Sequence, residues 1–165
     1  MLILGIDPGL AKSGFGIIDS DNRTCCAVKY GVIETKPGIC LPDRLKMIHQ
    51  GFYKLILQYK PNSIAVEELF FNKNAKTAID VGQARGVAIL AAALQDISVY
   101  EYTPLQVKQA VVGYGKAEKY QIQQMIKIFL NLDEVPRPDD AADALAVALC
   151  HINSLKLGRI LEKRF

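Results

Sequence analysis

The stretch LILGIDPG, residues 2–9, decides the fold. Its first five residues are Leu, Ile and Gly, which predicts a buried strand, and Asp7 closes that strand before a Pro-Gly turn. Two more strands are expected directly after it, over residues 14–18 and 24–35. Three consecutive strands with short connections predict an antiparallel meander.

Helical and strand patterns alternate through the rest of the chain. Apolar residues recur at three- and four-residue steps from Pro42 to Tyr59, as in an amphipathic helix. The further expected elements are a strand at 63–66, a helix at 75–94, a strand at 98–102, helices at 104–112 and 117–130, and a last helix from 139 or 140 toward Leu155. This order predicts an α/β fold, with helices flanking one mixed five-stranded sheet.

The composition fits one domain and excludes several classes of protein. We expect a domain over residues 1–155 and a basic tail over 156–165, in a chain that is 50% hydrophobic. The longest apolar run, residues 87–94, is far shorter than the roughly 18 residues of a membrane span. With no basic leader, the protein is expected to be cytoplasmic and not bound to membranes. The net charge of +3 does not by itself indicate a polyanion partner.

Cysteine and histidine do not form a recognisable site. The four cysteines contain no C-x-x-C pair and the two histidines are His49 and His151, so neither a zinc site nor a disulfide framework is expected. Both histidines are expected to be structural. The sequence also lacks the glycine-rich P-loop and the serine-hydrolase elbow.

Four acidic residues occupy positions where a carboxylate is costly. Asp7 and Glu67 each close an apolar strand, and ligand sites in α/β proteins form at such strand ends. Asp140 and Asp143 lie three residues apart on the last helix, so they share a face. Asp143 has apolar neighbours and no Lys or Arg within one turn, so its charge is expected to need a partner. Turn formation by Asp7 and helix capping by Asp140 are the structural alternatives.

A set of oxygen ligands favours Mg²⁺ or Mn²⁺ over zinc. Two strand-end carboxylates and a helical pair can surround two ions, and two ions roughly 3.5–4 Å apart stabilise both the attacking and the leaving oxygen of a phosphoryl displacement. The residues therefore predict metal-dependent phosphodiester hydrolysis with two Mg²⁺ ions per subunit, which Mn²⁺ can replace.

Four segments together cover nearly the whole chain. They are LGIDPGLAKSGFGI at 4–17, AVEELFFNKNAKTAIDVGQARGVAI at 65–89, YTPLQVKQAVVGYGKAEKYQIQQM at 102–125 and DDAADALAVALCH at 139–151. On these segments the chain resembles the bacterial RuvC-type Holliday junction resolvases, which are crossover junction endodeoxyribonucleases with a ribonuclease H-like fold.

The resemblance implies a site and a substrate. It implies that Asp7, Glu67, Asp140 and Asp143 bind the metals and are catalytic. The position of Asp140 is His in some relatives, and the D-A-A-D spacing selects Asp140 over Asp139. It also implies a homodimer that nicks two opposed strands of a four-way DNA junction in recombination and repair, with a branch-migration motor complex as partner.

Basic and aromatic residues in these segments are the expected DNA contacts. The family's V-K-Q and G-x-A-x-K elements imply phosphate contacts by Lys108 and Lys119. Phe70 matches a family phenylalanine and is expected to stack on an unpaired base, or else to cover the sheet edge. Further cations expected at the DNA are Lys73, Lys76, Arg85 and Lys116.

Three other functions stay open at this point. An ATPase of the actin and chaperone type begins with a similar Asp-Gly element, but its two lobes need about twice this length. A protein that binds branched DNA without cutting it would not need all four acids. Another ribonuclease H-like nuclease could act on RNA hybrids or on ordinary duplex.

Overall fold

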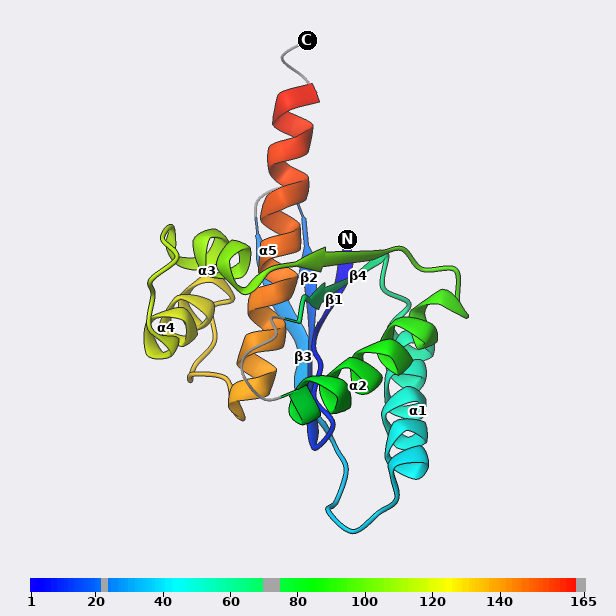
Figure 1. Cartoon of the computed structure of the whole chain (residues 1–165). Helices are drawn as coiled ribbons and strands as arrows, with labels where there is room; N and C mark the ends of the chain where they lie inside the picture. Colours follow the sequence, from blue (N-terminus) through cyan, green and yellow to red (C-terminus); the bar gives the residue numbers. More distant parts are fainter. Residues whose placement is uncertain (22–23, 70–74, 163–165) are drawn as a thin grey trace.

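One mixed sheet of five strands runs through the molecule in the order β3-β2-β1-β4-β5 (Figure 1). The computed structural model describes residues 1–21, 24–69 and 75–162, and its description leaves out the side chains of 75–77 and 158–162. The strands are β1 (Leu2–Asp7), β2 (Lys12–Ser20), β3 (Cys25–Glu34), β4 (Ser63–Glu67) and β5 (Val99–Tyr102). The first three form the predicted antiparallel meander, and β4 is parallel to both β1 and β5.

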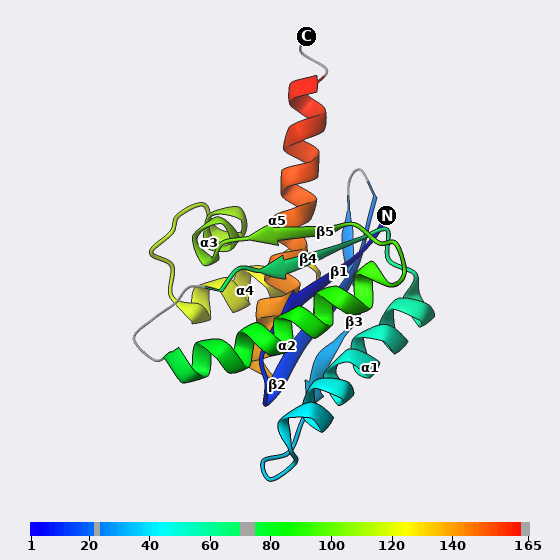
Figure 2. The same ribbon diagram turned by 45° about the vertical axis from the view of Figure 1, so that its right-hand side comes forward.

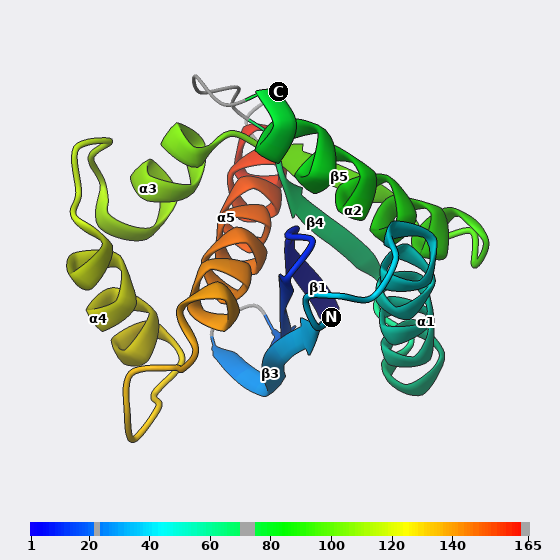
Figure 3. The ribbon, with the colours of Figure 1, turned by 60° about the horizontal axis from the view of Figure 1, so that its bottom comes forward.

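Helices cover both faces of the sheet. They are α1 (Leu41–Tyr59), α2 (Ala75–Ala93), α3 (Pro104–Val112), α4 (Lys119–Phe129) and α5 (Asp139–Glu162). Figure 3 shows α1 and α2 on one side and α3, α4 and α5 on the other. Side chains alternate along β1, so that Leu4 and Ile6 pack into the core under α1 and α2, whereas Ile3 packs into the core under α5. The predicted α/β architecture is confirmed.

The helix α5 lies directly on β1 and β2. A Cβ atom added at Gly5 would meet the backbone of Ala144 and the side chain of Ala148, and one at Gly16 would meet Leu145. The backbones can approach this closely because glycine and alanine face each other across the contact. The apolar first half of α5 is therefore buried, as its sequence predicts.

The helix α5 also extends beyond its predicted end near Leu155. It continues to Glu162, and Figure 1 shows its C-terminal part projecting past the sheet. The basic residues there are strong helix formers, and no proline interrupts the helix. The division of the chain at residue 155 stays a prediction, and the basic segment begins as a continuation of α5.

A buried histidine ties this helix to the sheet. Nε2 of His151 is 2.9 Å from Oγ of Ser63 on β4, and Nδ1 is 2.7 Å from the hydroxyl of Tyr102 on β5.

In the described part of the chain, no helix is both long and apolar enough to cross a bilayer.

Candidate active site

The ends of two parallel strands bring the first two acids together. β1 pairs with β4 in the register Ile6 to Val66, so the residues that follow, Asp7 and Glu67, lie side by side at the carboxyl edge of the sheet. Both side chains are half-buried. This is the arrangement that the two apolar strands predict.

The first turn of α5 brings the other two acids to the same edge. Asp7 pairs across β1 and β2 with Gly14, and a Cβ atom at Gly14 would collide with the backbone of Asp140. Because Gly14 has no side chain, the start of α5 can lie against this part of β2, which is paired with the end of β1. Asp140 and Asp143, one turn apart, therefore reach Asp7 from above the sheet.

Burial and neighbouring charges shift the ionisation of three of these acids, Asp7, Glu67 and Asp143. Burial, and then the charges of Glu67, Asp143 and Asp140, raise the pKa of Asp7 to about 8. Burial and the charge of Asp143 raise the pKa of Glu67 to about 7, and burial also raises the pKa of Asp143. The site therefore concentrates negative charge in a partly desolvated place, and a cation would relieve that charge.

A lysine from another helix partly balances this charge. Nζ of Lys119, on α4, lies 2.9 Å from Oδ2 of Asp143. Burial lowers the pKa of Lys119, but its contacts with Asp143 and Asp139 outweigh that effect and raise it. Asp143 thus has the partner that its charge was expected to need, and this partner is a lysine from another helix, which neighbours along α5 alone could not reveal. Asp143 therefore does not by itself require a metal.

The adjacent acid, Asp139, belongs to a separate network that the sequence analysis missed. Oδ1 of Asp139 accepts hydrogen bonds from Gln123 (3.0 Å) and Arg137 (2.7 Å), and its Oδ2 lies 3.4 Å from Nζ of Lys119. Arg137, two residues earlier in the chain, is the sequence signal that could have shown this. Asp139 is thus held by this network, and the choice of Asp140 for the acidic set stays a prediction.

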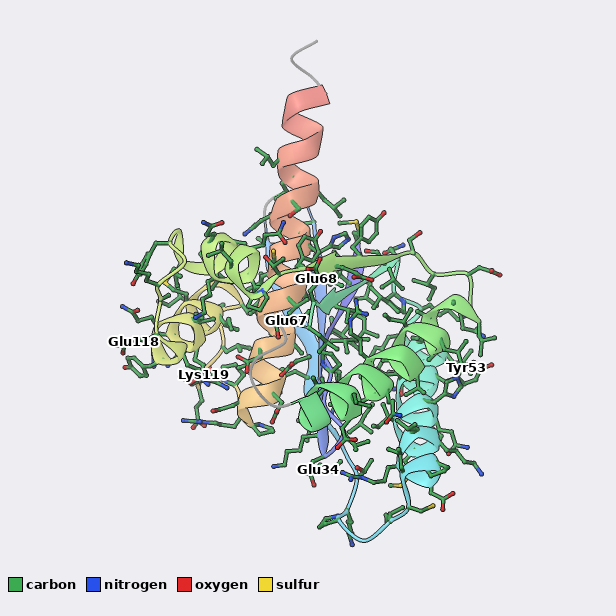
Figure 4. All side chains as sticks on the ribbon, viewed as in Figure 1. Glu34, Tyr53, Glu67, Glu68, Glu118 and Lys119 are labelled. Carbon is green, nitrogen blue, oxygen red and sulfur yellow. The ribbon has the colours of Figure 1, made fainter. Side chains whose placement is uncertain are left out.

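A cavity of about 230 Å³ opens beside the acids. Its lining includes Glu67, Asp143 and the two lysines expected to contact phosphate, Lys108 and Lys119. Figure 4 shows Glu67 and Lys119 beside the N-terminal part of α5. Lys108 is also close enough to Glu67 to lower the pKa of that carboxyl, against the effect of burial. The structure thus brings both lysines to the predicted acids.

The other predicted DNA contacts either do not line this cavity or lie outside the described residues. Nε of Arg85 nevertheless donates a hydrogen bond to the carbonyl oxygen of Glu67 at 3.4 Å. Lys116 is exposed on the connection between α3 and α4. Nη2 of Arg85 is ion-paired with Oε2 of Glu101 at 2.6 Å, and its contact with DNA stays a prediction. Phe70 and Lys73 lie outside the described residues, as does the side chain of Lys76.

The acids fit a hard divalent cation by their chemistry. Within the described ranges, no three His, Cys, Asp or Glu residues form a ready-made metal cage. The four neighbouring acids nevertheless offer only oxygen donors, which Mg²⁺ and Mn²⁺ prefer, and their mutual repulsion is what such a cation neutralises. Asp7, Glu67, Asp140 and Asp143 are therefore the residues that could hold it.

Comparisons with known proteins agree on one family. The family model described as crossover junction endodeoxyribonuclease RuvC matches residues 3–151. The enzyme of that name from Desulforamulus reducens is 58% identical over 92% of this chain and 93% of its own, and that from Finegoldia magna is 54% identical over 99% and 100%. The structure of Thermus thermophilus RuvC in complex with a Holliday junction substrate is 36% identical, with a TM-score of 0.92 over 96% of each chain.

Proposed function

The chain belongs to the RuvC family of crossover junction endodeoxyribonucleases, and from this premise we propose that it resolves four-way DNA junctions by Mg²⁺-dependent hydrolysis at Asp7, Glu67, Asp140 and Asp143. The convergence of these four acids at one edge of the sheet is the observation that carries the proposal. A relative of similar fold has been solved with a Holliday junction substrate, which supports the same substrate here.

The acids and the lysines have different roles in this proposal. The four carboxylates hold the cations at the end of β1. Strand pairing and the first turn of α5 fix the positions of these carboxylates. When bound there, Mg²⁺ supplies an activated water and stabilises the charge on the leaving oxygen. Lys108 and Lys119, on the cavity wall, attract the phosphate of the strand to be cut.

We also propose a homodimer, with the second copy bound at an apolar stripe on α2. The exposed side chains of Ile79 and Leu90 lie eleven residues, or about three turns, apart on α2, with Gly86 between them. The exposed Leu94 follows four residues after Leu90, just past the end of the helix. Figure 2 shows α2 on the outer side of the molecule, next to α1. A twofold dimer presents two identical sites to a junction whose symmetry is nearly twofold, so paired nicks in opposed strands follow from it.

Other features of this proposal rest on the family alone. They are action in recombination and repair, a cytoplasmic location, and cooperation with a branch-migration motor. Mn²⁺ is expected to replace Mg²⁺, because both accept oxygen ligands.

Substrate choice tests the proposed function. The protein should cut a mobile synthetic four-way junction in Mg²⁺ and leave matched linear duplex and an RNA–DNA hybrid intact. The two nicks should fall on opposed strands of like polarity. Equal cutting of the linear duplex or of the hybrid would instead assign the site to a general ribonuclease H-like nuclease, and tight junction binding without cutting would make the protein a binding module.

A further inference from the structure

Lys119 lies between two carboxylates in different surroundings. Its Nζ atom is 2.9 Å from Oδ2 of Asp143 and 3.4 Å from Oδ2 of Asp139. Asp143 belongs to the proposed metal-binding set. Asp139 does not, and its other oxygen is held by Gln123 and Arg137. Asp139 is thus anchored through Oδ1, while Oδ2 faces the lysine.

A cation at Asp143 would disturb this arrangement. Lys119 and the cation would then compete for one carboxylate, and two positive charges at such a distance repel each other strongly in a partly desolvated site. Asp139 offers the ammonium group a second carboxylate within reach. Lys119 could therefore give up Asp143 without losing its counter-charge and still line the cavity beside Glu67.

We propose that Asp139 is a positioning residue, which retains Lys119 at the site when a divalent cation takes Asp143. This inference rests on the proposed function, since it requires a cation at Asp143. Without Asp139, the remaining carboxylate paired with Lys119, among the residues that the structure describes, is that of Asp143. Cation binding would then have to break that ion pair with no compensation.

A double-mutant cycle on cation affinity tests the proposal. Mn²⁺ binding to the full chain without DNA is measured by calorimetry for the wild type, Asp139→Asn, Lys119→Met and the double variant. Lys119→Met should tighten Mn²⁺ binding both with Asp139 and with Asp139→Asn. The factor by which it tightens binding should be at least about three times larger when Asp139→Asn is present. A charge acting only at long range would instead give the same factor in both backgrounds, because the two effects would add.

Two control variants test whether the coupling with Lys119→Met is specific to the carboxylate of Asp139. Asp139→Glu keeps a carboxylate and should bring the coupling back toward the wild-type value. Asp133→Asn removes one exposed charge from the α4–α5 connection and should show no coupling with Lys119→Met. The side chain of Asp139 is 44% exposed, so Asp139→Asn should keep the wild-type melting temperature.

The possible failures are distinguishable. Tight Mn²⁺ binding with an equal effect of Lys119→Met in both backgrounds would overturn the role of Asp139 and leave the proposed function standing. Coupling of the same size with Asp133→Asn would also overturn it. Absence of Mn²⁺ binding by the wild type would overturn both the metal site and this inference.

Discussion

Asp7 is a half-buried carboxyl group with other acids beside it. Burial and its acidic neighbours raise its pKa from 3.8 to about 8. Between these two values the folded protein keeps a proton on Asp7 that the unfolded chain has released. The contribution of Asp7 to stability therefore falls as the pH rises from about 4 to about 8 in the metal-free protein.

Asp7→Asn should for this reason raise the melting temperature of the metal-free protein at pH 8. The amide keeps the shape of the side chain and has no charge to bury. For a chain of this size each kcal/mol shifts melting by roughly 2–4 °C, so we expect a rise of at least about 2 °C, measured by calorimetry in a chelator. Near pH 4 the difference should be small, and a lower melting temperature at pH 8 would contradict the burial of the charge.

The sequence showed which residues are acidic at the site but not how their charge is balanced. Asp7 and Glu67 could be predicted because each ends an apolar strand, which is a local signal. The contact of Lys119 with Asp143 joins residues 24 apart and depends on how α4 packs beside α5. No periodic pattern encodes that packing, so the lysine was predicted from family resemblance as a DNA contact and not as a partner of Asp143.

The contact between β2 and α5 depends on Gly14. Gly14→Ala would place a methyl group where the backbone of Asp140 lies, at a cost of about 1–3 kcal/mol of stability. It would also displace Asp140 from Asp7, and a shift of about 1 Å at a catalytic group can cost up to about 10²-fold in rate. Single-turnover cleavage of a junction measures this loss.

Gly16→Ala is the matched control. Gly16 lies two residues farther along β2 than Gly14, and its added methyl group would meet Leu145 of α5. It should lower stability to a similar extent and affect cleavage less. Full cleavage by Gly14→Ala would mean that Asp140 does not need this position.

The ring of His151 joins α5 to β4 and β5 through both of its nitrogen atoms. Burial lowers its pKa below the usual 6.5, so below pH 6.5 the unfolded chain binds a proton that the folded protein excludes. The contribution of His151 to stability should fall as the pH drops through this range, opposite in sign to the contribution of Asp7, and chemical denaturation at several pH values measures the sum of the two. His151→Gln cannot titrate and should remove the His151 contribution, whereas a pH profile identical to that of the wild type would assign it to other groups.

For the whole molecule, the elements could be predicted and their pairing only in part. The meander joins strands that are neighbours in sequence, and it is confirmed. The parallel pairs join residues as distant as Ile3 and Ser63, which no local pattern reveals. The end of α5 was predicted too early because a basic composition suggested a tail, although those residues also favour helix.

The proposed dimer interface on α2 can be tested through the oligomeric state of the whole molecule. Leu90→Glu would place a charge in the apolar stripe of α2, where a second copy would desolvate it. We expect a monomer in sedimentation, with a melting temperature typical of a folded subunit. Leu57→Glu on α1, where the leucine is similarly exposed, is the control and should stay dimeric. A Leu90→Glu protein that is still dimeric would place the interface elsewhere.

The central claim is that the acids at the sheet edge cut the junction and do not merely help to bind it. The direct measurement is single-turnover cleavage of a four-way junction in Mg²⁺ at saturating protein, with junction affinity determined on the same samples, for Asp7→Asn, Glu67→Gln and Asp143→Asn. We predict a loss of cleavage of at least about 10²-fold for each variant, with junction binding largely retained. Cleavage at the wild-type rate by Asp7→Asn, or a loss of binding that alone accounts for the loss of cleavage, would contradict the account.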